Sequence, residues 1–465
     1  MKKISIIIML VLTGVFAQAQ SVWDGSRQLW TRGTGTQDDP FLIESAANLA
    51  YLSYMVGKAF NTEGLYFKLT TDIDLNGSED LQWIPIGMAN DAYYEDGCER
   101  NTIPVCVYDR SNFSFKGHFD GADHRISNLY INKESGSVGL FGVLTGSYDS
   151  ENLTVVENVF VTSGYVKGSY SGGIVGNVSS NTDNCLISRC LNGAEIEGTN
   201  AGGIVGGSFG VVQNCNNFGN VTGSSSAGGI VGEAAQSIVE CFNTGTINSQ
   251  GTVGGMLGGS ARVNSLIVEN CYNTGEVSST GEISLYGNSV GGLVGFVRRG
   301  NSSMVNCYNT GNVASSFDEQ PGALVGSFNG EVTNSYYLND CGGAGEGESK
   351  SADEMRDPSF VNVLNFETDV WCADTLNSNN GYPILGANNL SVNEHSIAAL
   401  KVYPNPSNGH FTVEGTGSLS VYNALGQIVL VRDIRGQVDL ELPQGLYFMR
   451  LEGDSVIKAT KVLIR

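Results

Sequence analysis

Histidines and carboxylates around one predicted turn are the first residues of this 465-residue chain that could do chemistry. His118 and His124 flank the turn dipeptide Asp120-Gly121, and Asp72 and Asp74 lie in an alternating, strand-like run upstream. Imidazole nitrogens and carboxylate oxygens are metal ligands, and paired aspartates can bind calcium. A polar turn beside a strand explains the same residues more simply. We therefore predict no metal and no cofactor, with Asp72, Asp74, His118 and His124 as the candidates if a metal is bound.

Catalytic motifs do not accompany these residues. The sequence has no HExxH zinc motif, no GxSxG nucleophile elbow and no Gly-rich phosphate loop. Glycoside hydrolases need two carboxylates about 5–9 Å apart, and calcium-dependent lyases need clustered carboxylates with a nearby base. The acidic residues of the middle region are instead scattered, and Arg298-Arg299 is its one basic pair. We expect a non-catalytic protein, with a polysaccharide-active lyase or hydrolase as the alternative.

Three aromatic residues stand directly after cysteines of a repeated string: Phe242, Tyr272 and Tyr308. If the cysteines point inward, strand alternation points these rings outward. They would then form an exposed strip suited to a sugar or a partner protein, and they are our candidate ligand-binding residues. The alternative is that a corner of the chain breaks the alternation and buries the rings.

The strings that position these residues recur through the middle of the chain. A Gly-rich string, GG[I/M/L][V/L]G, has weaker copies at Val138 and Gly322, and successive copies start 26 to 37 residues apart. A string such as NCYNTGEV follows most copies. Two motifs in fixed order, with variable filler, indicate one structural unit stacked on itself. The full copies are Gly172–Gly176, Gly202–Gly206, Gly228–Gly232, Gly254–Gly258 and Gly291–Gly295.

These repeats predict an all-β fold, a right-handed parallel β-solenoid in which equivalent residues form rows. The cysteine row is predicted to be a buried stack, because no paired CxxC spacing indicates a metal site. The asparagine row is predicted to form a corner whose side chains hydrogen-bond along the stack. The rows are Cys190, Cys215, Cys241, Cys271 and Cys307, and Asn192, Asn217, Asn243, Asn273 and Asn309.

The two apolar residues of the Gly-rich string cannot both face inward on a straight strand. Either one of the two rows is exposed, or the flanking glycines bend the chain. The row in question is Ile204, Ile230, Met256 and Leu293.

Short helices are expected to cap the solenoid, because its open ends would template aggregation. Residues 44–60 have apolar residues at helical spacing, and Ser351 and Glu354 form a capping box before a second short helix. The remaining cysteines leave two candidate disulfides, Cys98 with Cys106 and Cys341 with Cys372.

The N-terminus and the composition predict export. Residues 1–19 combine a Lys-Lys start, a short apolar core and an Ala-Gln-Ala cleavage site, as in a signal peptide. We expect no transmembrane segment in the mature chain. The formal net charge of −22 makes nucleic acid and anionic membranes poor partners.

From Leu400 the repeats stop and short alternating strands predict a small separate β-sandwich. The predicted order is signal peptide 1–19, N-terminal cap 20–112, solenoid 113–345, C-terminal cap 346–390, linker 391–399 and β-sandwich 400–465.

Asp39 to Leu385 resembles the GLUG-motif proteins, through DPFLIESAANLAYL, FKLTTDIDL, FKGHFDGADHRISNLY, the Gly-rich copies and the closing NGYPIL. That family includes bacterial surface proteins, among them adhesin-like proteins and some IgA-cleaving metallopeptidases. Two departures concern the last unit, where GALVG lacks a glycine and Ser335 replaces the expected cysteine.

The tail resembles the type IX secretion C-terminal sorting domain of Bacteroidetes, through VYPNPSNGHFTVE, VYNALGQIV and LPQGLYFMRLEG. The resemblance implies recognition by the type IX secretion machinery and delivery to the outer-membrane surface or the extracellular space. The matching sorting-signal residues are Tyr403, Pro404, Asn405, Pro406, Gly409, Gly445 and Tyr447.

Together these features predict an exported, surface-attached or released solenoid with a non-catalytic role. Adhesion, or binding of a glycan, matrix or host protein, is the expected function. A polysaccharide-active enzyme and a passive surface spacer are the alternatives.

Overall fold

The computed structural model describes residues 22–87, 113–146, 152–179, 184–260, 265–281, 289–316, 320–386 and, apart from short gaps, 398–464. The predicted signal peptide at residues 1–19 and the predicted Cys98–Cys106 pair lie outside these residues. The chain divides into two compact units, residues 1–388 and 389–465, and each is described by itself.

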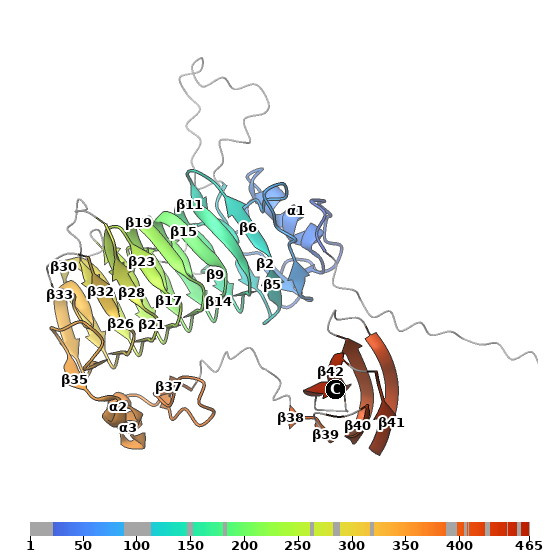
Figure 1. Ribbon diagram of the computed structural model, residues 1–465. Coiled ribbons are helices and arrows are strands. Elements are labelled where there is room, and N and C mark those ends of the chain that lie inside the picture. The colour runs from blue at the N-terminus through green and yellow to red at the C-terminus, as the bar shows by residue number, and fades with distance from the viewer. Residues whose placement is uncertain are drawn as a thin grey trace, which may run out of the picture. The chain divides into compact units, whose positions relative to one another are not determined.

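The first unit is a parallel β-solenoid, which confirms the predicted fold class (Figure 1). One coil consists of four short strands: β13 (Cys185–Ser188), β14 (Leu191–Asn192), β15 (Glu195–Gly202) and β16 (Val205–Gly207). Each strand pairs in parallel with its counterpart in the next coil, as Leu191 does with Asn216. Repeated sequence positions therefore form straight rows along the stack.

The strands of successive coils make three sheets. The first sheet contains β1 (Phe41–Ile43), β2 (Tyr66–Leu69), β4 (His118–Asp120), β8 (Phe141–Leu144), β9 (Thr154–Glu157), β12 (Val175–Val178), β13, β16, β17 (Val211–Gln213), β20 (Val231–Glu233), β21 (Ser237–Val239), β25 (Leu257–Ser260), β26 (Ile267–Glu269), β30 (Val294–Val305) and β33 (Val325–Thr333). The second contains β3 (Ile73–Asp74), β5 (Arg125–Ser127), β10 (Phe160–Val161), β14, β18 (Asn216–Asn217), β22 (Phe242–Asn243), β27 (Tyr272–Asn273), β31 (Tyr308–Asn309), β34 (Tyr336–Leu338) and β35 (Glu348–Lys350). The third contains β6 (Leu129–Asn132), β7 (Ser137–Val138), β11 (Gly164–Gly172), β15, β19 (Val221–Gly228), β23 (Ile247–Ser249), β24 (Thr252–Gly254), β28 (Val277–Ser279), β29 (Val290–Gly291) and β32 (Val313–Ser315).

The Gly-rich string turns the chain sharply between the third and fourth strands of a coil. In one copy, a Cβ added at Gly229 would lie 2.5 Å from Cγ of Asn243, and one at Gly232 would lie 2.6 Å from the carbonyl oxygen of Gly206. Only glycine fits at such distances. The two apolar residues of this copy, Ile230 and Val231, are both fully buried, so the turn lets both apolar rows face inward.

The possibility of an exposed apolar row is therefore wrong. The chain bends at the glycine pair, so strand alternation does not continue across it, and both rows enter the core. The buried row is Ile204, Ile230, Met256 and Leu293.

Asparagine side chains form a hydrogen-bonded ladder inside the corner after each second-sheet strand, as predicted. The Nδ2 of Asn217 donates to Oδ1 of Asn243 at 2.7 Å, and the Nδ2 of Asn243 donates to Oδ1 of Asn273 at 2.8 Å. Each amide also donates to a carbonyl of its own corner, as Asn243 does to Gly245 at 2.8 Å. These buried amides are thus satisfied within the stack, as buried polar groups require.

The cysteine row is buried and its thiols are free, as predicted. The thiol of Cys241 donates to the carbonyl of Val239 at 3.2 Å, and its Sγ accepts the backbone N–H of Cys215 at 3.3 Å. Burial raises the pKa of the Cys241 thiol, so this thiol stays protonated. Ser335 continues the row, because its hydroxyl accepts the N–H of Cys307 at 3.2 Å.

The residue before each row cysteine, and the equivalent residue before Val159 and Ser335, adopts a left-handed backbone conformation. Asparagine occupies most of these positions, but Arg189 has a φ of 51° and is exposed. Left-handed angles strain most L-residues and are tolerated best by glycine and asparagine. The row is Asn158, Arg189, Asn214, Glu240, Asn270, Asn306 and Asn334.

Arg189→Asn is expected to stabilise the solenoid by about 1 kcal/mol, because asparagine relieves the left-handed strain at this corner. The urea midpoint of the purified chain measures the effect. Arg189→Ala is the matched control, since it removes the same side chain without asparagine's tolerance and should not raise the midpoint. Equal midpoints for the two variants would contradict the explanation.

Helix α1 (Ala46–Val56) lies at the N-terminal end of the stack, as expected (Figure 1). Ser45 caps it by accepting the N–H of Asn48 at 3.2 Å. Its apolar residues, including Leu49 and Leu52, join the solenoid core.

Residues 351–386, here called the strap, follow the last coil. They contain α2 (Ala352–Arg356), α3 (Pro358–Leu364), β36 (Trp371–Cys372) and β37 (Ile384–Leu385). The predicted Ser351–Glu354 capping box is present. The prediction that this segment closes the end of the solenoid is wrong, because the strap packs along the outer side of the second sheet. Met355, Phe360, Leu364 and Trp371 share one cluster with aromatic residues of that sheet.

The predicted Cys341–Cys372 disulfide is also wrong. Both thiols are free, with Cys341 buried and Cys372 exposed. The carbonyl of Cys341 accepts the N–H of Val313 at 2.7 Å in the last coil, whereas Cys372 pairs with Ile384 in the strap. The strap runs along the side of the coils, so its cysteine is not brought to the end of the stack.

The second unit is a small, mainly antiparallel sheet with its own core, which includes Leu419, Val421, Met449 and Val462. Its strand order is β38-β43-β42-β40-β39, with β41 beside β40. The strands are β38 (Ala398–Ala399), β39 (Lys401–Tyr403), β40 (His410–Asn423), β41 (Ile428–Glu441), β42 (Gly445–Glu452) and β43 (Ile457–Ile464).

Candidate binding surfaces

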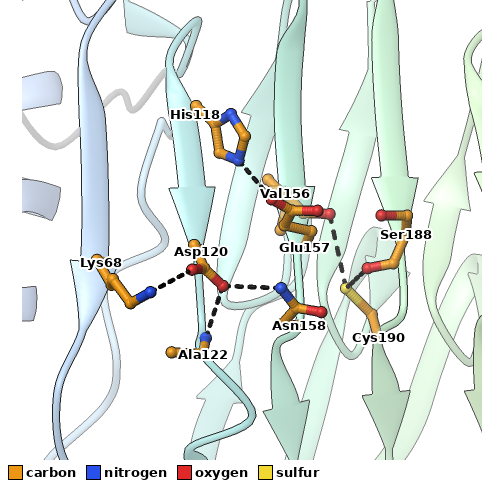
Figure 2. Close-up of polar contacts among 9 residues, drawn as sticks. All are labelled: Lys68, His118, Asp120, Ala122, Val156, Glu157, Asn158, Ser188 and Cys190. Carbon is orange, nitrogen blue, oxygen red and sulfur yellow. Dashed lines mark hydrogen bonds and ion pairs between the residues drawn. The ribbon is translucent and has the colours of Figure 1, made fainter. Parts of the chain in front are cut away.

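A polar cluster lies on neighbouring strands of the first sheet near the N-terminal end (Figure 2). His118 on β4 contacts Glu157 on β9, with Nε2 and Oε1 2.6 Å apart. Lys68 on β2 pairs with Asp120 at 3.1 Å, and Asp120 also accepts the Asn158 amide at 2.8 Å. Parallel register places these side chains in rows one strand apart.

The carboxylates of this cluster are already engaged. Burial raises the pKa of Asp120, but the hydrogen bonds from Asn158 and from the N–H of Ala122, together with Lys68, outweigh it and hold the pKa below its usual value. A general acid needs a raised pKa, so Asp120 is suited to holding the turn rather than to proton transfer.

The candidate metal ligands contact separate partners. His124 Nδ1 lies 3.2 Å from Asp72 Oδ1, while Asp74 Oδ1 accepts the N–H of Asn76 and the amide of Asn128, each at 2.8 Å. His118 faces Glu157 instead. Among the described residues, no three His, Cys, Asp or Glu side chains are placed to hold a metal ion.

The predicted aromatic strip exists as a row but is not exposed. The rings of Phe242 and Tyr272 stack with centroids 4.8 Å apart, and those of Tyr272 and Tyr308 stack at 5.1 Å. All three are buried. Trp371 of the strap packs on both tyrosines, with centroids 5.9 and 5.4 Å away. The prediction of an exposed strip is wrong because a distant segment covers the row.

Hydrogen bonds fix the strap over this row. The hydroxyl of Tyr308 donates to the carbonyl of Pro383 at 2.6 Å and accepts the Asn379 amide at 2.7 Å. Corner asparagines hold it as well, since Asn334 donates to the carbonyl of Val363 at 2.8 Å and Asn306 to that of Phe366 at 3.2 Å.

A groove of about 870 Å³ lies between the strap and the last coils. Residues of the last coils form most of its polar lining. The Phe366 side chain, which the strap contributes, is 61% exposed. The lining includes Glu269, Asn306, Thr333, Asn334, Tyr336, Glu348, Phe366 and Glu367.

Three carboxylates line this groove, and they differ in their surroundings. Glu348 pairs with Lys350 at 2.7 Å, and Glu269 accepts the Asn270 amide at 3.3 Å. Glu367 has no such partner among the described residues and adopts a φ of 59°. Strained backbone of this kind concentrates at functional sites.

Residues 401–465 match the family described as the secretion system C-terminal sorting domain. The chain carries a type IX sorting domain. It is therefore an exported protein that the type IX machinery delivers to the cell surface or the extracellular space. No helix among the described residues is long and apolar enough to span a bilayer.

Two curated proteins are similar to part of the chain. A protein of Evansella cellulosilytica, provisionally described as a Gly-rich membrane protein, is 31% identical over 171 residues, and halomucin of Haloquadratum walsbyi is 30% identical over 151 residues. The matches cover 36% and 32% of this chain but 16% and 1% of those proteins. The chain thus matches a small part of each relative's length.

A solved structure from Bacteroides ovatus, provisionally assigned as an immunoglobulin A1 protease, is also similar. The match has a TM-score of 0.51 and 22% sequence identity, and covers 77% of this chain and 95% of that chain. At this identity the likeness shows a shared fold.

The groove was not found from the sequence. Its walls combine Asn306 and Asn334, which were assigned no role from the sequence, with the strap residues Phe366 and Glu367. The exposed Phe366, next to the strained Glu367, was the available signal.

Proposed function

We propose that this exported solenoid binds a glycan chain, or a glycosylated matrix or host protein, without cleaving it. The observation that carries the proposal is the groove between the strap and the last coils. Asparagine, threonine and glutamate side chains offer donors and acceptors for hydroxyl groups, and Phe366 offers a ring face.

Rigid strands support binding in this groove. Asn334 donates to Asn306 at 2.6 Å and to the strap at 2.8 Å, so both walls are linked before any ligand arrives. A groove formed in advance loses less entropy when a ligand binds. The repeats resemble the GLUG-motif family, which includes adhesin-like surface proteins, and this resemblance agrees with a binding role.

A hydrolase is the second candidate, and Glu367 favours it. A glycosidase needs two carboxylates, and Glu269 and Glu367 line the same groove. Glu348 forms an ion pair with Lys350, whereas Glu269 accepts only an amide, so Glu269 and Glu367 are the carboxylates that would act.

An array of glycans and matrix proteins, probed with the chain from Gln20 to Arg465, tests the proposal. Phe366→Ala should weaken binding at least tenfold, about 1.4 kcal/mol, because it removes the exposed ring. Leu376→Ala is the matched control, since Leu376 is 88% exposed on the strap but does not line the groove.

The same samples are assayed for cleaved glycan. If cleaved glycan is detected with the unmodified chain but not with Glu367→Gln, the protein is a hydrolase and the binding proposal is wrong. Absence of saturable binding to every glycan and protein would leave a passive spacer as the better description.

A further inference from the structure

The end of the solenoid opposite α1 has an unpaired strand edge (Figure 1). Among the described residues, β33 pairs with β30 alone. The N-terminal edge of the same sheet is covered, because the N–H of Leu42 on β1 donates to the carbonyl of Arg32 at 3.1 Å. The last strand of the third sheet, β32, is covered as well, since the N–H of Val313 donates to the carbonyl of Cys341 at 2.7 Å. The edge of β33 is instead open to a further strand.

The last coil also leaves part of the solenoid core uncovered. Phe328 and Val332 on β33 pack against the core, in register with Val297 and Met304 on β30. Val297 and Met304 are buried beneath the last coil, whereas Phe328 and Val332 are partly exposed. A strand added beside β33, with apolar side chains facing the core, would complete this layer.

The usual protection of an edge strand is missing from β33. Native edges are kept short, carry lysine or proline, or are bulged. β33 has nine residues and no lysine, arginine or proline. The bulge in this pair lies on β30, where residues 298–301 stand opposite Asn329 alone. By contrast, β35 at the end of the second sheet has three residues, two of which, Glu348 and Lys350, form an ion pair. The β33 edge is therefore a template for strand addition.

The charges of the last coil are mainly acidic. Residues 320–350 contain four acidic residues and one basic residue, Lys350, which pairs with Glu348 at 2.7 Å. Glu331 is exposed on the outer face of β33 and forms no ion pair within the described part of the chain. The arginines Arg298 and Arg299 lie one strand further back, in β30. Opposite charges on neighbouring strands stabilise a pair and like charges destabilise it, so a basic strand fits this edge better than a second copy of the chain does.

We propose that the β33 edge binds an extended basic segment of another protein by strand addition. Main-chain hydrogen bonds along β33 would supply the affinity, and the alternation of side chains would supply the selectivity. Every second side chain of the segment would be apolar and cover Phe328 and Val332. The side chains between them would be lysine or arginine, facing Glu331. Because Val332 and Thr333 also line the groove, one end of the segment would lie beside it.

Fluorescence anisotropy of labelled peptides, with the chain from Gln20 to Arg465, tests this edge. The probe is an octapeptide of alternating valine and lysine, which should bind saturably. The same peptide with every backbone amide N-methylated keeps its side chains and charge but cannot pair with a strand. An octapeptide of alternating valine and glutamate keeps the pairing and reverses the charge. Both should bind at least tenfold more weakly.

Variants of the chain place the binding on β33. Asn329→Pro removes a backbone N–H at a residue that has no partner in β30, so the coil should fold normally. Asn329→Pro and Glu331→Lys should each weaken binding of the valine–lysine peptide at least tenfold. Glu195→Lys, at an exposed position of β15, is the matched charge control and should leave the affinity unchanged. Phe366→Ala should also leave it unchanged, which separates this edge from glycan binding in the groove.

Four results would overturn the proposal. The first is a lack of saturable binding of the valine–lysine peptide. The second is equal affinity for the N-methylated peptide, since charge alone would then explain the binding. The third is an unchanged affinity in both Asn329→Pro and Glu331→Lys. The fourth is a dimer in sedimentation velocity that Asn329→Pro dissociates, because the occupant of the edge would then be a second copy of this chain.

Discussion

Gly229→Ala is expected to lower the free energy of unfolding of the solenoid by about 3 kcal/mol or more. The added methyl group would lie 2.5 Å from Cγ of Asn243 and also meet the carbonyl of Gly255 in the next coil. Neither neighbour can move alone, because Asn243 is tied into the amide ladder and Gly255 repeats the same turn. The strain would therefore spread to adjacent coils.

Urea unfolding, followed by circular dichroism, measures this loss. Gly300→Ala is the matched control in the same solenoid, since its nearest neighbour would lie 3.4 Å from the new Cβ. That change should alter stability by less than about 1 kcal/mol. A similar midpoint for both variants would show that the glycines are not required by close packing.

Trp371→Ala is expected to detach the strap while the coils stay folded. Trp371 is buried against Tyr272 and Tyr308, and large-to-small changes at buried tryptophans cost about 3–5 kcal/mol. The strap keeps its other buried contacts, through Met355, Phe360 and Leu364, and hydrogen bonds that contribute about 0.5–1.5 kcal/mol each, but it loses its largest buried side chain. The open state of the strap should therefore become populated.

Limited proteolysis detects this opening, because cleavage follows the population of the open form. Cuts within residues 351–386 should appear about 100-fold faster, with the coils intact by mass spectrometry. Leu376→Ala, on an exposed part of the strap, should leave the rate unchanged. An unchanged rate in Trp371→Ala would mean that the ring stack does not hold the strap.

The sequence predicted those features that repeat. Five asparagines and five cysteines at equivalent positions predicted two rows, because parallel pairing in register stacks equal positions. The same reasoning placed Tyr272 on the outer side of its strand. It did not predict burial of that ring, because Trp371 comes from a non-repeating segment about 100 residues later.

Two features limit what strand alternation and sequence motifs can predict here. Alternation predicts which face a side chain takes within one strand, but the glycine pair before Ile230 bends the chain, which confirms the second of the two alternatives for the apolar rows. The groove joins coil and strap segments that are apart in the chain, and no sequence motif marks such a contact.

The amide ladder gives the solenoid a direction. Every Nδ2 points to the next coil, and the series ends where Asn309 donates to the carbonyl of Ala323 at 3.1 Å. A rod cut after an earlier coil would leave a donor unmatched, at a cost of about 1–3 kcal/mol. Whole coils inserted or deleted inside the ladder leave every donor matched. The length of the rod can thus change through gain or loss of complete internal repeats, while the contact of Asn309 with Ala323 still ends the ladder.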